Sequence, residues 1–396
     1  MKILRLIYEW PPPWDGLAPA PYEMTQAQLK LGHTFDIFCG RWPFSGKIET
    51  LPNVLHHLFP REIVPGTLLL TSAPAMFIYY LYYRTKNKPD IIHAHGHFGA
   101  WLYLYRYFLL KFFPKAGELK IPLIGHFHNT VKGRWVISQE QKKNIKFYSK
   151  YLAWPMALLS DQYLIKVASY CIFVSHGTRD QAIKYYKADP AKCIVVETGV
   201  NTDLFCLVGF EEKDKARKEL HLNPEDHIIL NHGAMVERKN VHLLIECLNF
   251  LPPEYKLLLL GPGDDKYIDR LNDMVVQFKL EKRVIRIGYT PYPQVPIAFQ
   301  VSDLFVLPSS FEGLPKVVMQ SLSCGVPALA SGFRVNEEID GLYYISELKA
   351  ETIAQEIKDV LSKHVRVDIP KVHRLYSWDV KAGQVEEIYG KVIQKN

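Results

Sequence analysis

The chain has 396 residues, of which 48% are hydrophobic and 22% are charged, and its formal net charge is +7. These values are typical of a soluble globular protein of two domains, and they exclude an intrinsically disordered, collagen-like or disulfide-rich chain. The six cysteines form no C-x-x-C pair, so we expect free thiols in a reducing compartment.

The N-terminus has neither the long apolar region nor the cleavage site of a signal peptide. The longest apolar run, residues 67–83, is interrupted at Pro74, so we expect no transmembrane helix. We therefore predict a cytoplasmic protein.

The charge is distributed unevenly along the chain. Residues 1–205 contain 24 Lys and Arg against 14 Asp and Glu, a net charge of +10, whereas the remaining residues carry −3. A basic first half indicates an anionic partner, such as a membrane surface, a pyrophosphate-linked lipid or an acidic glycan. Peripheral attachment to the inner membrane face is one such hypothesis. No nucleic-acid recognition motif is present, so we do not expect nucleic acid as a partner.

The first half alternates short apolar runs with helical stretches. Strands are expected at residues 1–10, 34–40, 90–96, 121–129, 170–177 and 192–200. A helix is expected over residues 20–33, closing at Gly32. This alternation predicts a parallel sheet with helices on both faces.

The charged residues 208–226 are expected to form a linker with one short helix, after which the alternation starts again. Strands are expected at residues 227–233, 255–263, 283–289 and 304–310, and helices at residues 241–252, 265–280 and 376–394. The predicted fold class is therefore α/β, with two Rossmann-like domains that face each other across a cleft at the carboxyl ends of their sheets.

The segment FEGLPKVVMQSLSCGVPALAS, residues 311–331, is the most informative part of the chain. The strand expected before it ends just ahead of Glu312, and residues after Leu314 have helical spacing. Glu312 and the amides of Gly313, Leu314 and the neighbours of Pro315 are therefore expected where a parallel sheet binds ligands and a helix N-terminus attracts phosphate. Pro315 itself has no amide hydrogen to donate.

This segment resembles the E-x7-E segment of retaining glycosyltransferases of the GT-B type, family GT4, and the order of segments is similar over residues 1–390. In that family the first Glu lies beside the sugar of a nucleotide-sugar donor and the second holds the ribose. The resemblance assigns these roles to Glu312 and Gln320. Gln320 departs from the family pattern, because an amide can bind ribose hydroxyls but carries no charge.

The segment NHGAMVERKN, residues 231–240, resembles the family's G-R-x-x-x-x-K, whose Arg and Lys bind the donor diphosphate. Gly233 and Lys239 match this pattern, whereas Ala234 stands at the Arg position. We hypothesise that Arg238 supplies the missing guanidinium. Cations are needed there because negative charge grows on the leaving diphosphate as the sugar–oxygen bond breaks.

Three further donor-site residues follow from the resemblance. Gly263 ends the strand–G-x-G turn that lines the family's nucleotide pocket, and Gly16 lies in the loop where the backbone approaches the donor phosphates. His128 falls at the family's first-domain histidine, which borders the donor sugar. A strand-end histidine is also often only structural.

No catalytic metal is predicted. The alternating His93, His95 and His97 could form a metal site, but they match a strand end of the family that binds no metal. The chain contains no D-x-D, which a metal-dependent transferase of the GT-A type would usually have.

Two aromatic and basic stretches allow two interpretations each. Residues 101–115 form either a buried helix beside the sheet or a helix at a membrane interface. Residues 131–154 form either a solvated basic face or a surface for anionic lipid. This second stretch contains Lys132, Arg134, Lys142, Lys143, Lys146 and Lys150.

The resemblance implies an acceptor-side domain over residues 1–205, a nucleotide-sugar domain over 206–375, and a helix over 376–396 that returns to the first domain. The function predicted is a retaining hexosyltransferase that moves a sugar from UDP- or GDP-sugar to a glycan or lipid-linked acceptor, in cell-surface polysaccharide or glycolipid synthesis. No cofactor is expected beyond this co-substrate. The alternatives are a catalytically weakened GT-B protein that binds a nucleotide sugar, which Ala234 and Gln320 suggest, and a GT-B-like sugar-nucleotide epimerase.

Overall fold

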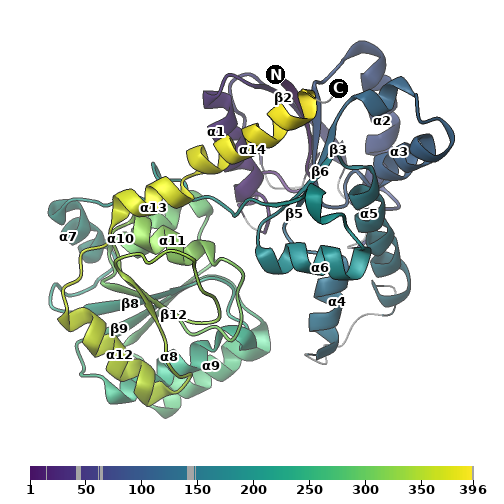
Figure 1. The fold of residues 1–396 in the computed structure, drawn as a ribbon. Coiled ribbons are helices and arrows are strands. Elements are labelled where there is room, and N and C mark those ends of the chain that lie inside the picture. The colour runs from purple at the N-terminus through teal and green to yellow at the C-terminus, as the bar shows by residue number, and fades with distance from the viewer. Residues whose placement is uncertain are drawn as a thin grey trace. The chain divides into compact units, whose positions relative to one another are not determined.

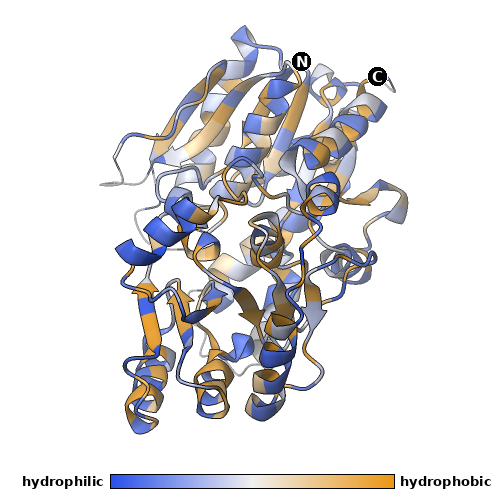
Figure 2. Cartoon of the chain, turned by 90° about the vertical axis from the view of Figure 1, so that its left-hand side faces the viewer, coloured by the Kyte–Doolittle hydropathy of each residue, from blue (hydrophilic) through white to orange (hydrophobic). Residues whose placement is uncertain are grey.

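The computed structural model describes residues 1–14, 16–41, 46–60, 62, 66–140, 147 and 149–394. The chain divides into two compact units (Figure 1), the first made of residues 1–198 and 381–396 and the second of residues 199–380. The strands of both units are mostly hydrophobic along their length, whereas most helices alternate hydrophobic and hydrophilic residues (Figure 2). This is the pattern of parallel sheets that helices cover.

The first unit contains a seven-stranded sheet in the order β3-β2-β1-β4-β5-β6-β7. Every neighbouring pair of strands is parallel. The strands are β1 Lys2–Leu6, β2 Thr34–Arg41, β3 Val54–Pro60, β4 Ile91–His95, β5 Leu123–Phe127, β6 Tyr170–Phe173 and β7 Cys193–Val195. The strand order reverses between β1 and β4, so this sheet has a ligand-binding switch point at the carboxyl ends of those strands.

Helices cover both faces of this sheet. They are α1 Pro19–Lys30, α2 Ser72–Lys86, α3 Ala100–Phe112, α4 Val131–Glu140, α5 Trp154–Val167 and α6 His176–Tyr186. Leu4 and Leu6 point to the face where the buried residues of α2, α3 and α5 form one core. Arg5 points to the opposite face, where its guanidinium donates to Pro21 O at 3.2 Å and to the Thr25 hydroxyl of α1.

The end of the chain packs in the first unit. Helix α14, Trp378–Ile393, places Glu386 against the imidazole of His33, with Oε2 and Nε2 2.6 Å apart. The Tyr389 hydroxyl, which is fully buried, hydrogen-bonds Nδ1 of His93 on β4. Helix α14 therefore packs in the first unit, on the face of the sheet that α1 also covers.

The second unit contains a six-stranded sheet in the order β10-β9-β8-β11-β12-β13, again with parallel neighbours. The strands are β8 His227–His232, β9 Tyr255–Leu260, β10 Val284–Gly288, β11 Leu304–Leu307, β12 Ala328–Ala330 and β13 Leu342–Tyr344. The helices are α7 Phe210–Glu219, α8 Val241–Cys247, α9 Asp265–Gln277, α10 Pro296–Gln300, α11 Lys316–Ser323, α12 Ala350–Ser362 and α13 Ile369–Tyr376. The strand order reverses between β8 and β11, which defines a second switch point.

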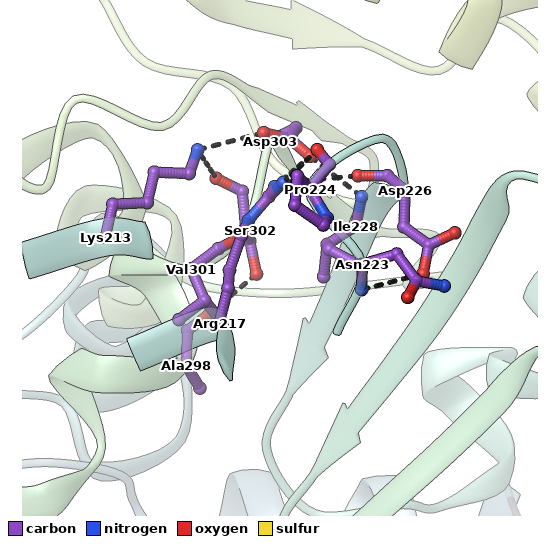
Figure 3. Close-up of polar contacts among 10 residues, drawn as sticks. All are labelled: Lys213, Arg217, Asn223, Pro224, Asp226, Ile228, Ala298, Val301, Ser302 and Asp303. Atoms are coloured by element: carbon purple, nitrogen blue, oxygen red, sulfur yellow. Dashed lines mark hydrogen bonds and ion pairs between the residues drawn. The ribbon is translucent and has the colours of Figure 1, made fainter. Parts of the chain in front are cut away.

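A buried ionic network fixes α7 to the second sheet (Figure 3). Arg217 of α7 is 8% exposed, and its guanidinium donates to Val301 O at 2.9 Å and to Asp303 Oδ2 at 2.6 Å. The other oxygen of Asp303 pairs with Lys213 at 2.9 Å. The Ile228 amide, at the start of β8, donates to the same carboxylate at 2.9 Å.

Replacing Arg217 with Met should lower the free energy of unfolding by about 3 kcal/mol, because it leaves Asp303 and buried carbonyls without their main donor. Lys213→Met is the matched control. Its ammonium is more exposed and should cost less than about 1 kcal/mol. Urea unfolding of both variants measures the difference, and equal losses would contradict this account of the network.

The helix expected over residues 101–115 lies beside the sheet, as one interpretation predicted, but it is buried on one side only. The side chains of Trp101, Leu104, Phe108 and Phe112 on α3 are each more than a third exposed, because only the opposite side of α3 packs on the unit. In the basic stretch 131–154, Lys142, Lys143 and Lys146 lie outside the described residues. No helix in the described part of the chain is both long and apolar enough to cross a bilayer.

Candidate active site

The loops that follow β8 and β9 are joined through their backbones. The amide of Gly233 donates to Leu260 O at 2.9 Å, and the amide of Met235 donates to Pro262 O at 2.8 Å. Gly233 and Gly261 both have φ +131°, and any Cβ on Gly261 would collide with the Gly233 carbonyl. Glycine is therefore required at position 261, because the backbones of the two loops come this close to each other. Gly263 pairs with Met235 in this same junction.

Lys239 directs its ammonium at Gly233. The side chain is 8% exposed, and its Nζ occupies the space that a Cβ on Gly233 would need. Burial is the main reason that the pKa of Lys239 is lowered, although nearby Glu312 opposes the shift. Among the described residues no carboxylate forms an ion pair with this ammonium. A buried cation without such a pair is costly, so the site is suited to an anionic ligand.

Glu312 and Arg238 come together at the end of β11. Arg238 Nη1 lies 2.7 Å from Glu312 Oε1 and also donates to Phe311 O at 3.0 Å. Ser309 Oγ donates to the same Glu312 oxygen at 2.9 Å. The Glu312 carboxylate is thus held at the switch point of the second sheet, beside the two cations of the β8 loop.

Asn240 fixes the β8 loop to the β11 loop. Its φ of 49° is left-handed, and its Nδ2 donates to Pro308 O at 2.9 Å and to Ser310 Oγ at 3.0 Å. The Ser310 amide completes the junction by donating to Arg238 O at 2.8 Å. Asn240 therefore sets the distance between Lys239 and Glu312.

The segment after Glu312 leads into α11 through Pro315, the N-cap residue. The amides of Gly313 and Leu314 form no backbone hydrogen bond within the described chain, so they remain able to bind an anion. Gln320 lies one turn further along α11 and is 2% exposed. Its amide nitrogen is 3.4 Å from the Tyr292 hydroxyl, which is a long contact.

The first unit has a pocket of about 440 Å³ at the switch point of its own sheet. Gly16 and His128, which the sequence singles out, both line it. Gly16 has φ +55°, and a Cβ there would lie 2.8 Å from a carboxylate oxygen of Glu9. That oxygen accepts a hydrogen bond from the amide of Leu17 at 2.6 Å, which closes the loop after β1.

Four histidines form a stack, and three of them, His95, His126 and His128, line this pocket. His93 and His95 on β4 are followed by His126 and His128 on and after β5, and successive rings are 4.6 to 4.7 Å apart. Burial lowers the pKa of His128 to about 4 and lowers the pKa of the other three well below the usual value. The stack is therefore neutral at physiological pH.

The stack includes one group of three histidines that is compact enough for a metal ion, His93, His95 and His126. His93 and His126 are joined by a hydrogen bond between Nε2 and Nδ1, which lie 3.1 Å apart. The other ring nitrogen of His93, Nδ1, is hydrogen-bonded to the Tyr389 hydroxyl. Both nitrogens of His93 therefore already have partners, so in this arrangement the three histidines do not offer three free nitrogens to a metal.

The comparisons with known proteins decide the family. The family described as "Glycosyltransferase Family 4" matches residues 14–204, and "Glycosyl transferases group 1" matches residues 212–375. The chain belongs to the GT4-like glycosyltransferases of the GT-B fold. The predictions of the family, the fold class and an enzyme that transfers glycosyl groups are confirmed.

This glycosyltransferase is 22% identical over 98% of its length to an uncharacterized glycosyltransferase of Methanocaldococcus jannaschii, of which 98% is covered. It is 25% identical to UDP-Gal:alpha-D-GlcNAc-diphosphoundecaprenol alpha-1,3-galactosyltransferase of Escherichia coli, over 74% of the chain and 70% of that protein. Sucrose-phosphate synthase from Thermosynechococcus elongatus has the same fold, with a TM-score of 0.76 at 18% identity over the whole of both chains.

Two residues, one in the pocket of the first unit and one in the β8 loop of the second, were not predicted from the sequence. Asp161, from the middle of α5, lines the first pocket and lies 3.5 Å from His97. The Tyr186 hydroxyl donates to the other oxygen of Asp161 at 2.9 Å, and burial raises the pKa of this carboxyl. A buried Asp within the apolar pattern of a helix is the signal that could have found it. For Asn240, the signal is a residue tolerant of left-handed φ directly after Lys239.

Proposed function

We propose that this glycosyltransferase transfers a sugar with retention of configuration from a UDP- or GDP-sugar to a glycan or lipid-linked acceptor. The observation that carries the proposal is the buried ammonium of Lys239, which has no described carboxylate as a partner and lies against a backbone with glycine at Gly233. A diphosphate supplies the charge that this ammonium lacks and fits close to a glycine backbone.

In this proposal the second unit holds the donor. Lys239 stabilises the charge that develops on the leaving diphosphate, and Arg238 replaces the guanidinium absent at Ala234. Arg238 also orients Glu312, which positions the donor sugar. The Gly313 and Leu314 amides bind phosphate oxygen, and Gln320 contacts the ribose, after a change in its buried side chain. The departing phosphate then guides the acceptor to the same face of the sugar.

The acceptor belongs to the pocket of the first unit, where His97, Asp161 and Arg134 offer partners for hydroxyl and anionic groups. We keep His128 as a sugar-contacting residue and Gly16 as the position that lets a substrate approach the β1 loop. We also propose that transfer needs no metal, because in the one compact histidine group of the described chain both ring nitrogens of His93 are already hydrogen-bonded. The basic first unit is further proposed to bring the enzyme to an anionic membrane.

Calorimetric titration with UDP, GDP, dTDP and ADP in the absence of added metal tests the donor part. Micromolar binding of one nucleotide, weakened by Arg238→Ala, is the expected result and identifies the base. If no nucleotide binds, the donor site proposed around Lys239 is wrong. Flotation with vesicles of phosphatidylglycerol at low salt tests membrane attachment, and vesicles of phosphatidylcholine are its control.

Asn240→Gly should lower kcat/KM for transfer about thirtyfold while leaving the fold intact. Glycine accepts the left-handed backbone at this position but removes both hydrogen bonds to the β11 loop, each of which contributes about 1 kcal/mol. Steady-state kinetics of Asn240→Gly, with Ser310→Ala as a control that removes only one of these bonds, measures the effect. Full activity in Asn240→Gly would show that Asn240 does not position the site.

A further inference from the structure

An apolar groove lies between α3 and α5, outside the pocket described above. It has a volume of about 140 Å³ and is lined by Leu69, Trp101, Leu104, Met156, Leu159 and Tyr163. Three of these side chains are more than a third exposed, namely Trp101, Leu104 and Leu159. The indole of Trp101 donates to Leu69 O at 2.8 Å, which fixes the ring at the groove.

The groove adjoins the polar pocket of the first unit. Leu68 lines the pocket and Leu69 lines the groove, and in the same way Asp161 and Ser160 of α5 face one cavity each. Lining residues of the two cavities are therefore neighbours along the chain at two independent points. This proximity is the reason to consider one ligand with a polar and an apolar part.

The polar pocket defines the polar part of that ligand. Arg134 lines it and its guanidinium suits a phosphate, whereas the buried pair of His97 and Asp161 suits a hydroxyl group. The groove offers only hydrocarbon and aromatic surface along most of its wall. A phosphate-linked sugar on a hydrocarbon chain has these two chemistries in this order.

We propose that the groove between α3 and α5 binds the hydrocarbon chain of a lipid-linked acceptor whose phosphate and sugar occupy the neighbouring polar pocket. This inference rests on the proposed function, because it selects the lipid-linked member of the acceptor classes given there. The exposed Phe108 and Phe112 continue the stripe of α3 beyond the groove, with Lys111 5.3 Å from the ring of Phe112. That composition suits the lipid–water boundary from which such a chain would enter.

The test measures quenching of tryptophan fluorescence by alkyl phosphates that carry a bromine at the end of the chain. Dodecyl and hexyl probes are used below their micelle concentrations, and Trp101→Phe assigns the signal. We expect saturable quenching of Trp101 and a dissociation constant at least about tenfold lower for the dodecyl probe, since each buried methylene contributes up to about fourfold.

Matched variants on α3 locate the hydrocarbon chain. Leu104→Gln should raise the dissociation constant of the dodecyl probe about fivefold, whereas Leu110→Gln, which changes another exposed leucine of α3 outside the groove, should not change it. Arg134→Gln should weaken both probes equally. Equal affinity for the two chain lengths, or equal effects of Leu104→Gln and Leu110→Gln, would overturn the proposal.

Two other occupants of the groove are distinguished by the same samples. Quenching by brominated phosphatidylglycerol vesicles without quenching by the monomeric dodecyl probe would mean a bilayer contact and would overturn the proposal. A dimer in light scattering that Leu104→Gln dissociates would mean a second copy of the chain and would also overturn it. Titration of UDP into the same protein tests the donor site separately. Failure of the donor-site proposal can therefore be distinguished from failure of the groove proposal.

Discussion

Replacing Lys239 with Met should lower kcat/KM for sugar transfer about a thousandfold, equivalent to about 4 kcal/mol of transition-state stabilisation. The lost interaction is the one between the buried ammonium and the leaving diphosphate, which strengthens as the sugar–oxygen bond breaks. Lys239→Met should also weaken binding of the nucleoside diphosphate product in calorimetry.

The stability of the same variant separates a ligand-binding role from a structural one. Lys239 is 8% exposed and its burial lowers its pKa, so the folded protein bears a desolvation cost for this charge. Met should therefore leave the free energy of unfolding unchanged or raise it by about 1 kcal/mol. A large loss of stability, or nucleotide affinity equal to that of the native protein, would contradict the assigned role.

Two further variants control for charge alone. Lys266→Met removes an exposed ammonium from α9 and should change neither kcat/KM nor stability. Lys239→Arg keeps the charge, but a planar guanidinium is too wide for the space beside Gly233 and should restore little activity. Recovery of full activity in Lys239→Arg would indicate that any cation in this loop is sufficient.

Periodicity was enough to predict the central part of both sheets, because parallel strands buried on both faces are continuous apolar runs. Residues 227–233 and 255–263, for example, contain β8 and β9. Strands β3, β12 and β13 were not predicted, since β3 is half exposed and β12 and β13 have only three residues each. Local pattern carries little information where a strand is short and one face is solvated.

The candidate site could be predicted only in part, for a similar physical reason. Glu312 and Lys239 stand at loop positions where strands end, and chain order alone indicates that such loops meet at a switch point. The pairing of Arg238 with Glu312 joins residues 74 positions apart. The sequence supplies the residue types for this ion pair, but only the crossing of β8 and β11 brings them within hydrogen-bond distance.

The histidine stack was missed for the same reason, because it arises from register. His95 on β4 pairs in register with His126 on β5, so alternating histidines on two neighbouring strands fall on one face. The sequence shows the two pairs separately, as HAH and HFH. Alternating histidines of this kind suggest a metal site before they suggest stacked rings. The structure instead gives four neutral rings behind a pocket.

Acid should destabilise the protein steeply below pH 6.5 because of this stack. The folded-state pKa of His128 is lowered to about 4, whereas an unfolded histidine titrates near 6.5. Above pH 6.5 neither state is protonated, so the stack has no effect on the pH dependence of stability. Below pH 6.5 the unfolded state binds a proton at this histidine and the folded state does not. His128 alone should therefore lower the free energy of unfolding by about 1.4 kcal/mol per pH unit until about pH 4.

The other three histidines of the stack add to this loss in the same direction, since their pKa values are also lowered by burial. Arg5, buried behind the stack, opposes a positive charge on His93. Urea unfolding between pH 7.5 and 5 measures the slope. His128→Gln, whose amide can still hydrogen-bond His95, should retain about 2 kcal/mol more stability at pH 5 relative to its own value at pH 7.5.

The exposed His176 provides the matched control, because His176→Gln removes a histidine from the same unit without touching the stack. Its slope should equal that of the native protein. Parallel curves for the native protein and His128→Gln would instead place the acid sensitivity elsewhere. Since three rings of the stack line the pocket proposed for the acceptor, protonation of the stack should disturb that wall, and acceptor binding there should weaken over the same pH range as stability.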